Sequence, residues 1–174
     1  SDVYKRQLRL IANLISANSG DILYQEKNIS SLNPVQYRRE VSYCFQQPSL
    51  FGQTVRDNLI FPYEIRKVDV NDKQIADLLN QVDLSADFLD KKITALSGGE
   101  KQRVALIRNI IFLPKILLLD EVTTGLDNQS KDIVHNLIKD VSEKGVTIIQ
   151  VTHDQSEIDE ASNILRVKKG GIIE

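Results

Sequence analysis

A run of aliphatic residues followed by two carboxylates constrains the fold of this chain more than any other feature. Residues 116–119 are Ile-Leu-Leu-Leu, and Asp120 and Glu121 come directly after them. A run of this kind is typical of a parallel strand buried on both faces. A helical apolar pattern over 133–141 and a second aliphatic run over 146–151 follow. This alternation of strand and helix predicts an α/β protein with a mostly parallel sheet.

Composition limits the classes of function. The 174 residues suffice for one globular domain, and a net charge of −2 gives no general attraction to nucleic acid, so we expect no nucleic-acid partner. The single cysteine, Cys44, excludes an internal disulfide and is compatible with a cytosolic setting. No apolar run approaches the roughly 20 residues of a bilayer span, so a role at the membrane would need a partner.

The string Leu96-Ser97-Gly98-Gly99-Glu100 is the most specific motif. Ser97 and Glu100 have the spacing of a capping box, and a simple helix start is the alternative interpretation. Two adjacent glycines cost a helix roughly 0.5–1 kcal/mol each relative to alanine, but they leave its N-terminus open to a phosphate.

The string resembles the signature motif of the ATP-binding-cassette (ABC) family. The resemblance implies that Ser97, Gly98, Gly99 and Glu100 form a nucleotide-binding element that acts in trans. Ser97 and Gly99 would contact the γ-phosphate of ATP held by the opposite subunit of a homodimer.

The carboxylate pair resembles the end of a Walker B strand. Carboxylates at this edge of a parallel sheet line its ligand crevice. Asp120 would hold Mg²⁺ through water, and Glu121 would orient or deprotonate the attacking water. The alternative is an acidic pair that caps the next helix. Val122 stands where the family usually has proline, which changes the stiffness of the loop and leaves the carboxylates in place.

Three further residues match family motifs. Gln46 resembles the Q-loop glutamine, which reaches Mg²⁺ and the attacking water, and Asp127 belongs to a D-loop-like string at the dimer interface. His153 resembles the switch histidine that contacts the γ-phosphate. His135 is interpreted as a surface or packing residue, and Cys44 as a packing residue.

The remaining patterns predict the other elements. They are a helix over 8–15, a strand-like segment over 21–26, a strand over 41–45, a short helix over 55–59 in an otherwise irregular segment, a helix with an apolar face over 75–82, a helix from 97, and a closing hairpin over 164–167 and 171–173.

The resemblance implies a P-loop NTPase-like cassette. Residues 8–46 and 113–174 would form the core, and residues 47–112 an inserted helical subdomain that carries the signature. Residues 1–7 show no clear period, and we interpret them as a non-native leader; an ordinary polar helix start is the alternative.

A glycine-rich phosphate loop ending in Gly-Lys-Ser/Thr is not present in this sequence. The family has this loop just before the helix that corresponds to Leu8 onward, so we expect an N-terminally truncated cassette without its first strands. Such a chain should bind ATP weakly and should expose sheet edges.

Two longer strings, over 41–62 and 97–120, are similar to the Fet-type iron-export ATPase subunits of bacteria. The function implied is an ATPase that powers a transmembrane permease, with ATP and Mg²⁺ as cofactors. The protein would lie in the cytoplasm, attached through the permease to the inner face of the plasma membrane. The alternatives are a soluble ABC ATPase of the translation or repair type and a non-functional fragment. The segment between Gln46 and Ser97 is too short for the coiled coil of repair types.

Overall fold

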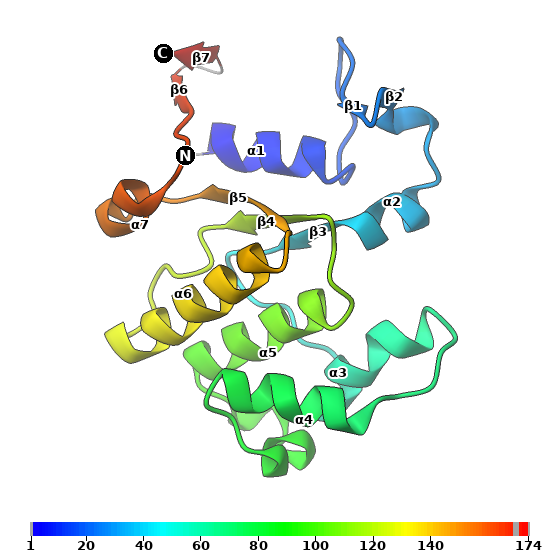
Figure 1. Ribbon diagram of the computed structural model, residues 1–174, viewed down its shortest axis with the longest axis vertical. Helices are drawn as coiled ribbons and strands as arrows, with labels where there is room; N and C mark the ends of the chain where they lie inside the picture. The colour runs from blue at the N-terminus through cyan, green and yellow to red at the C-terminus, as the bar shows by residue number, and fades with distance from the viewer. Residues whose placement is uncertain (1, 169–170, 174) are drawn as a thin grey trace.

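A parallel three-stranded sheet lies at the centre of the fold in the computed structural model, which describes residues 2–168 and 171–173 (Figure 1). Its strands are β3 (Val41–Cys44), β4 (Ile116–Asp120) and β5 (Thr147–Val151), in the order β3-β4-β5. Both pairings are parallel. The predicted α/β class with a parallel sheet is therefore confirmed.

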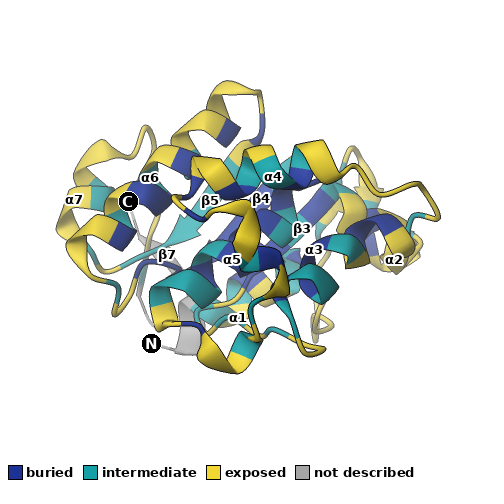
Figure 2. Ribbon diagram, turned by 90° about the horizontal axis from the view of Figure 1, so that it is seen from below, coloured by how far each residue is buried: buried dark blue, intermediate teal, exposed yellow. Residues whose placement is uncertain are grey.

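Helices cover both faces of the sheet (Figure 1). Alternate residues of β4 point to opposite faces. Leu118 packs in a cluster with Leu8 of α1 (Asp2–Ile11), whereas Leu117 and Leu119 belong to the larger core. That core includes residues of α5 (Gly98–Ile110) and α6 (Asn128–Glu143). Figure 2 shows β4 and α5 among the most buried elements, while α2 and α7 at the ends are largely exposed.

A group of helices packs below α5 in Figure 1. It consists of α3 (Val55–Glu64), α4 (Asp72–Gln81) and the 3₁₀ helices η2 (Ala86–Asp90) and η3 (Ile93–Ala95). The predicted division of the chain into core and helical subdomain stays a prediction.

The prediction for the α3 region was wrong in extent. Thr54 caps the helix in a capping box with Asp57, but the helix continues through Pro62 to Glu64. Pro62 lies in the last turn, where its missing N–H removes a single hydrogen bond, and burial of Leu59 and Tyr63 in the core favours continuation.

The N-terminal helix also differs from its prediction. α1 begins at Asp2 rather than Leu8 and ends at Ile11. Asn13 has a φ of 54°, outside the helical region, and Leu14 and Ile15 are exposed. The apolar sequence pattern therefore continues beyond the end of the helix. The interpretation of residues 1–7 as a non-native leader stays a prediction.

The strand-like segment over 21–26 is instead part of a hairpin. β1 (Leu23–Tyr24) and β2 (Lys27–Asn28) pair antiparallel around Gln25 and Glu26, both with positive φ. This is the conformation of a two-residue hairpin turn. The helices η1 (Ile29–Ser31) and α2 (Pro34–Glu40) follow.

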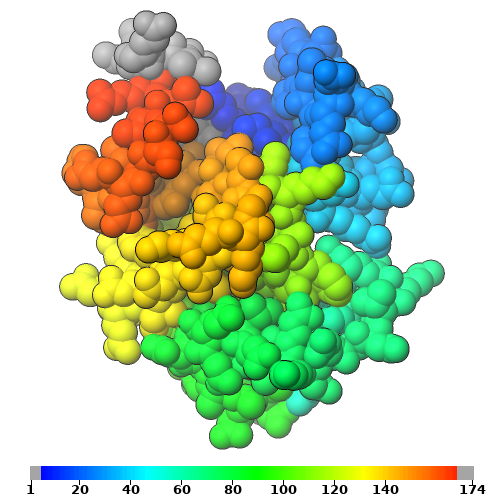
Figure 3. Space-filling model, in the orientation of Figure 1, coloured from blue at the N-terminus to red at the C-terminus, as the bar shows by residue number. Residues whose placement is uncertain are grey.

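After β5 the chain forms α7 (Gln155–Glu160), β6 (Arg166–Lys168) and β7 (Gly171–Ile173). The last two strands pair antiparallel, which confirms the predicted hairpin; residues 169–170 at its turn lie outside the described residues. Figure 3 shows α1 recessed between the β1–β2 region and the segment that carries α7. Within the described residues, no helix is long and apolar enough to cross a membrane.

The run over 146–151 was predicted as a buried strand, but β5 is only half-buried and Thr147 is exposed. Among the described strands β5 pairs with β4 alone, so one of its edges has no ladder partner there.

Candidate active site

The site begins where β4 ends. Asp120 is 2% exposed and Glu121 7%, although both carry carboxylates. Glu121 has a φ of 49°, a left-handed conformation that is unfavourable for a residue with a Cβ. Its N–H donates to the Val151 carbonyl at 3.0 Å, and its own carbonyl accepts from the Thr124 N–H at 3.1 Å. The chain therefore turns sharply at Glu121 while remaining tied to β5.

Gln46 and His153 meet at the Glu121 carboxylate. The Gln46 Nε2 donates to Glu121 Oε2 at 2.8 Å, and the His153 Nε2 lies 3.4 Å from Glu121 Oε1. The three residues come from the ends of β3, β4 and β5, because the carboxyl ends of parallel strands lie at one edge of the sheet. The structure thus brings together three of the predicted site residues; their roles stay predictions.

The Lys5 side chain of α1 also contacts Gln46 and Glu121. Its Nζ donates a hydrogen bond to Gln46 Oε1 and lies 3.6 Å from Glu121 Oε2. Sequence reasoning set Lys5 aside with the rest of residues 1–7 and so missed the contact. The position of the ammonium shows that a cation is accommodated between the Gln46 amide oxygen and the Glu121 carboxylate.

Asp120 has one satisfied and one unsatisfied oxygen. The Tyr43 hydroxyl donates to Oδ2 at 2.6 Å, whereas the buried Oδ1 has no hydrogen-bond partner in the part of the chain that the structure describes. Burial, together with this hydrogen bond, raises the pKa of Tyr43 to about 12, so the phenol remains a donor. Tyr43 was not predicted, because the register that places it on the same face as Asp120 becomes visible only in the structure. Tyr43 pairs with Leu118, and Leu118 shares its face of β4 with Asp120.

These oxygen groups suit a hard divalent cation. Asp120 Oδ1 has no hydrogen-bond partner among the described residues, and one oxygen each of Gln46 and Glu121 lies beside the Lys5 ammonium. No group of three or more His, Cys, Asp or Glu side chains in the described part of the chain could hold a metal alone. Mg²⁺ is commonly bound by one or two carboxylates with waters and substrate phosphates, so such a site needs no larger protein cage.

The signature residues form the predicted capping box at the start of α5. Ser97 Oγ accepts from the Glu100 N–H at 3.2 Å, and Glu100 Oε2 accepts from the Ser97 N–H at 2.7 Å. Burial raises the pKa of Glu100, but the Ser97 N–H and the nearby Lys91 ammonium outweigh it and leave the pKa below its usual value. Glu100 is therefore an ionised cap.

The two glycines have different surroundings. A Cβ at Gly98 would meet no atom of the described residues within 4 Å, whereas one at Gly99 would lie 2.6 Å from Ser130 Oγ. Gly98 thus leaves the helix N-terminus open, as predicted for both, while Gly99 is also required for close packing of α5 against the start of α6.

Asp127 caps α6, on which Ser130 lies. Asp127 Oδ1 accepts from the Ser130 N–H and Oδ2 from the Ser130 hydroxyl, both at 2.8 Å. These bonds hold the pKa of Asp127 below its usual range. The packing of Gly99 against Ser130 brings the signature helix and the Asp127 loop side by side.

Two other residues were interpreted as structural. Cys44 is buried, and burial raises the pKa of its thiol to about 12, which confirms a packing role. His135, interpreted as a surface or packing residue, is half-buried, and its Nε2 lies 2.7 Å from Glu157 Oε1. Val122, in place of the family's proline, is buried in the core.

Comparison with known proteins decides the family. The model of the family described as "ABC transporter" matches residues 7–124. The chain belongs to the ABC transporter family. It is an ABC ATP-binding subunit, and membership implies that ATP is its nucleotide.

Several curated relatives are similar over most of this chain. The probable iron export ATP-binding protein FetA of Escherichia coli (strain K12) is 45% identical over 162 residues, covering 92% of this chain and 72% of the relative. The energy-coupling factor transporter ATP-binding protein EcfA1 of Streptococcus mutans is 34% identical, covering 95% and 60%. A putative export ATP-binding/permease protein of Rickettsia bellii is also 34% identical, covering 95% of this chain but only 29% of its own length. The chain thus spans less than two thirds of the length of the Streptococcus mutans and Rickettsia bellii relatives.

Proposed function

We propose that the intact protein, with the phosphate loop that this sequence does not contain, hydrolyses ATP to power a membrane transporter, with Glu121 as the residue that activates water. The observation that carries the proposal is the meeting of Gln46, Glu121 and His153 at one edge of the sheet, beside a buried Asp120 with an unpartnered oxygen. These groups cover several of the parts that phosphoryl transfer to water uses: a base, a positioned amide, a phosphate contact and a cation ligand.

Each residue has a distinct part in the proposed reaction. The Gln46 amide holds one oxygen of the Glu121 carboxylate, so the carboxylate is oriented and its remaining lone pairs can accept a proton from water. His153 lies at the other carboxylate oxygen, where its imidazole can donate to the γ-phosphate. Burial of Glu121 strengthens these interactions because few waters compete with them.

Asp120 and Gln46 are the proposed Mg²⁺ ligands. Asp120 offers Oδ1 while Tyr43 fixes the other oxygen, and Gln46 offers its amide oxygen. A bound Mg²⁺ would neutralise phosphate charge.

The signature would act on a second subunit. In a homodimer that sandwiches two ATP molecules, Ser97, Gly98, Gly99 and Glu100 would contact the nucleotide of the partner. The open space at Gly98 supports access of a phosphate to the α5 N-terminus. Asp127, beside the signature, would lie at the same interface.

The partner proposed is a transmembrane permease at the cytoplasmic face of the plasma membrane. The relative named as an export ATP-binding/permease protein supports a permease partner, and the 45% identity to a probable iron export protein supports a metal ion as cargo. No nucleic-acid partner is proposed.

Phosphate release by the full-length protein tests the proposal. We expect hydrolysis that requires Mg²⁺ and falls at least about a hundredfold in Asp120→Asn, with Glu143→Gln on the exposed end of α6 as a matched carboxylate control. An Asp120→Asn variant with wild-type activity at every Mg²⁺ concentration would remove Asp120 from the site. The cargo can be identified by measuring the ATPase activity of the protein co-expressed with the permease. Stimulation by Fe²⁺ but not by Mn²⁺ or Zn²⁺ would identify iron as the cargo.

A further inference from the structure

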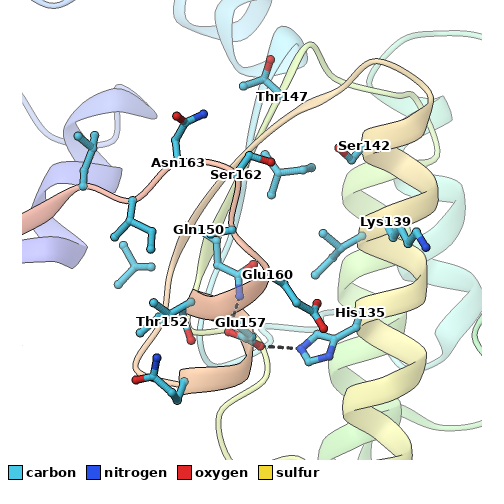
Figure 4. A pocket seen from close by; sticks show the side chains of 18 of the residues that line it. His135, Lys139, Ser142, Thr147, Gln150, Thr152, Glu157, Glu160, Ser162 and Asn163 are labelled. Carbon is cyan, nitrogen blue, oxygen red and sulfur yellow. Dashed lines mark hydrogen bonds and ion pairs between the residues drawn. The ribbon is translucent and has the colours of Figure 1, made fainter.

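Glu157 is a buried carboxylate outside the residues assigned above. It lies on the short helix α7, most of which is exposed, yet its side chain is only 6% exposed. Donors from other parts of the chain, Thr152 among them, converge on it. Thr123 Oγ1 donates at 2.6 Å, Gln150 Nε2 donates at 2.5 Å, and His135 Nε2 lies at 2.7 Å. Figure 4 shows His135 and Gln150 directed at the Glu157 carboxylate.

The Thr123 bond links Glu157 to the turn that presents Glu121. Thr123 follows Glu121 by two residues and is buried. The left-handed conformation of Glu121 is strained for a residue with a Cβ and persists only where neighbouring contacts fix it. The backbone bonds of Glu121 fix it from the side of β5, and the Thr123–Glu157 bond fixes the next part of the turn.

The same helix is attached to the segment that carries His153. Asp154, next to His153, caps α7 and accepts a hydrogen bond from Lys131 Nζ at 2.8 Å. Lys131 and His135 are four residues apart on α6 and so lie on one face. They hold Asp154 and Glu157 respectively. The segment 152–157 is thus anchored twice to the helix that Asp127 begins.

The charge state of Glu157 agrees with this arrangement. Burial raises the pKa of Glu157, but hydrogen bonds from Thr123, Thr152 and His135 outweigh burial and keep the pKa below its usual value. The ionised carboxylate accepts from every partner at once. A glutamine of the same shape has one accepting oxygen and a donating nitrogen, so it cannot satisfy all of them.

We propose that Glu157 is a positioning residue of the active site, which holds the Glu121 turn, the His153 segment and α6 in one fixed arrangement. It acts through Thr123 and the 152–157 segment and not on the reacting atoms. The proposal rests on the proposed function for its consequence in catalysis, but the arrangement itself can be tested without nucleotide.

Hydrogen exchange measured by mass spectrometry on the full chain is the test. In Glu157→Gln we expect amides of 121–124 and 152–158 to exchange about tenfold faster or more, because the loss of a hydrogen bond to a charged group makes local opening more frequent. Peptides from α3 should be unchanged. Glu160→Gln, an exposed carboxylate on the same helix, is the matched control and should resemble the wild type.

Thr123→Val tests the same link from its other end and serves if Glu157→Gln does not fold. It should accelerate exchange in 121–124, and combining it with Glu157→Gln should add little to the acceleration there. Unchanged exchange in both segments, or equal acceleration across the whole chain, would overturn the proposal.

Hydrolysis by the full-length protein separates the two proposals. Glu157→Gln should lower kcat by roughly ten- to a hundredfold with an unchanged KM for ATP. Local loosening with full hydrolysis in Glu121→Gln would refute the proposed function and leave the positioning role intact. Loss of hydrolysis in Glu121→Gln without faster local exchange in Glu157→Gln would refute the positioning role of Glu157 and leave the proposed function intact.

Discussion

Alanine at Gly99 should destabilise the protein, whereas alanine at its neighbour Gly98 should stabilise it. A Cβ at Gly99 would lie 2.6 Å from Ser130 Oγ and 3.2 Å from Ser130 Cβ, both closer than van der Waals contact. Ser130 can retreat only by giving up its 2.8 Å hydrogen bond to Asp127, and otherwise α5 and α6 must separate.

The expected free energies follow from these contacts. Overpacking costs about 1–3 kcal/mol, and a lost hydrogen bond about 1 kcal/mol. Replacing glycine by alanine in a helix returns about 0.5–1 kcal/mol. Gly99→Ala should therefore lose about 1 kcal/mol of unfolding free energy, while Gly98→Ala, with nothing within 4 Å, should gain about 0.5 kcal/mol.

Urea denaturation followed by circular dichroism at 222 nm measures both changes. Ser130→Ala is the partner variant, because removing Oγ relieves the closest contact, and Gly99→Ala should cost less in that background. If Gly99→Ala stabilises the protein as much as Gly98→Ala, the packing argument is wrong. Equal losses in the two backgrounds would show that Ser130 is not the obstacle.

Three further predictions concern single side chains. Tyr43→Phe should lower the free energy of unfolding by about 1.5–3 kcal/mol in urea denaturation, because the buried Asp120 carboxylate loses the hydrogen bond from the Tyr43 hydroxyl; an unchanged midpoint would contradict this. The pKa of Glu157 is lowered in the fold, so its contribution to stability is complete above the ordinary carboxyl pKa of 4.5 and declines as pH falls through the folded value. The stability difference between wild type and Glu157→Gln should accordingly be constant near pH 7 and shrink below about pH 4.5. A difference that grows in acid would contradict a lowered pKa of Glu157 in the fold. The Cys44 thiol is buried with its pKa raised to about 12, so it should react with a disulfide reagent at pH 8 at least about a hundredfold more slowly in the native chain than in guanidinium; equal rates would refute its burial.

The sequence patterns predicted the centre of the fold well. Two features can be inferred from neighbouring residues alone: the strand β4, from its uninterrupted aliphatic run, and the capping box, from the spacing of Ser97 and Glu100. The structure confirms both. The gathering of Gln46, Glu121 and His153 followed from the rule that parallel strands end at one edge.

Other features depend on contacts that a linear pattern does not contain. The early end of α1 is set by the backbone of Asn13, and the extension of α3 past Pro62 by burial against the core. Tyr43 and Glu157 were missed because their partners, Asp120 and Thr123, are 77 and 34 residues away. The close approach of Gly99 to Ser130 likewise becomes visible only when α5 and α6 are packed together.

The most direct test of the account is a single-turnover measurement of ATP cleavage by the full-length protein with Glu121→Gln. The substitution keeps the shape of the side chain and removes the proton acceptor at the point where Gln46 and His153 meet. We predict that ATP binds with nearly unchanged affinity, while cleavage slows by about a hundredfold or more. Cleavage at the wild-type rate in this variant would contradict the central claim that Glu121 activates the attacking water.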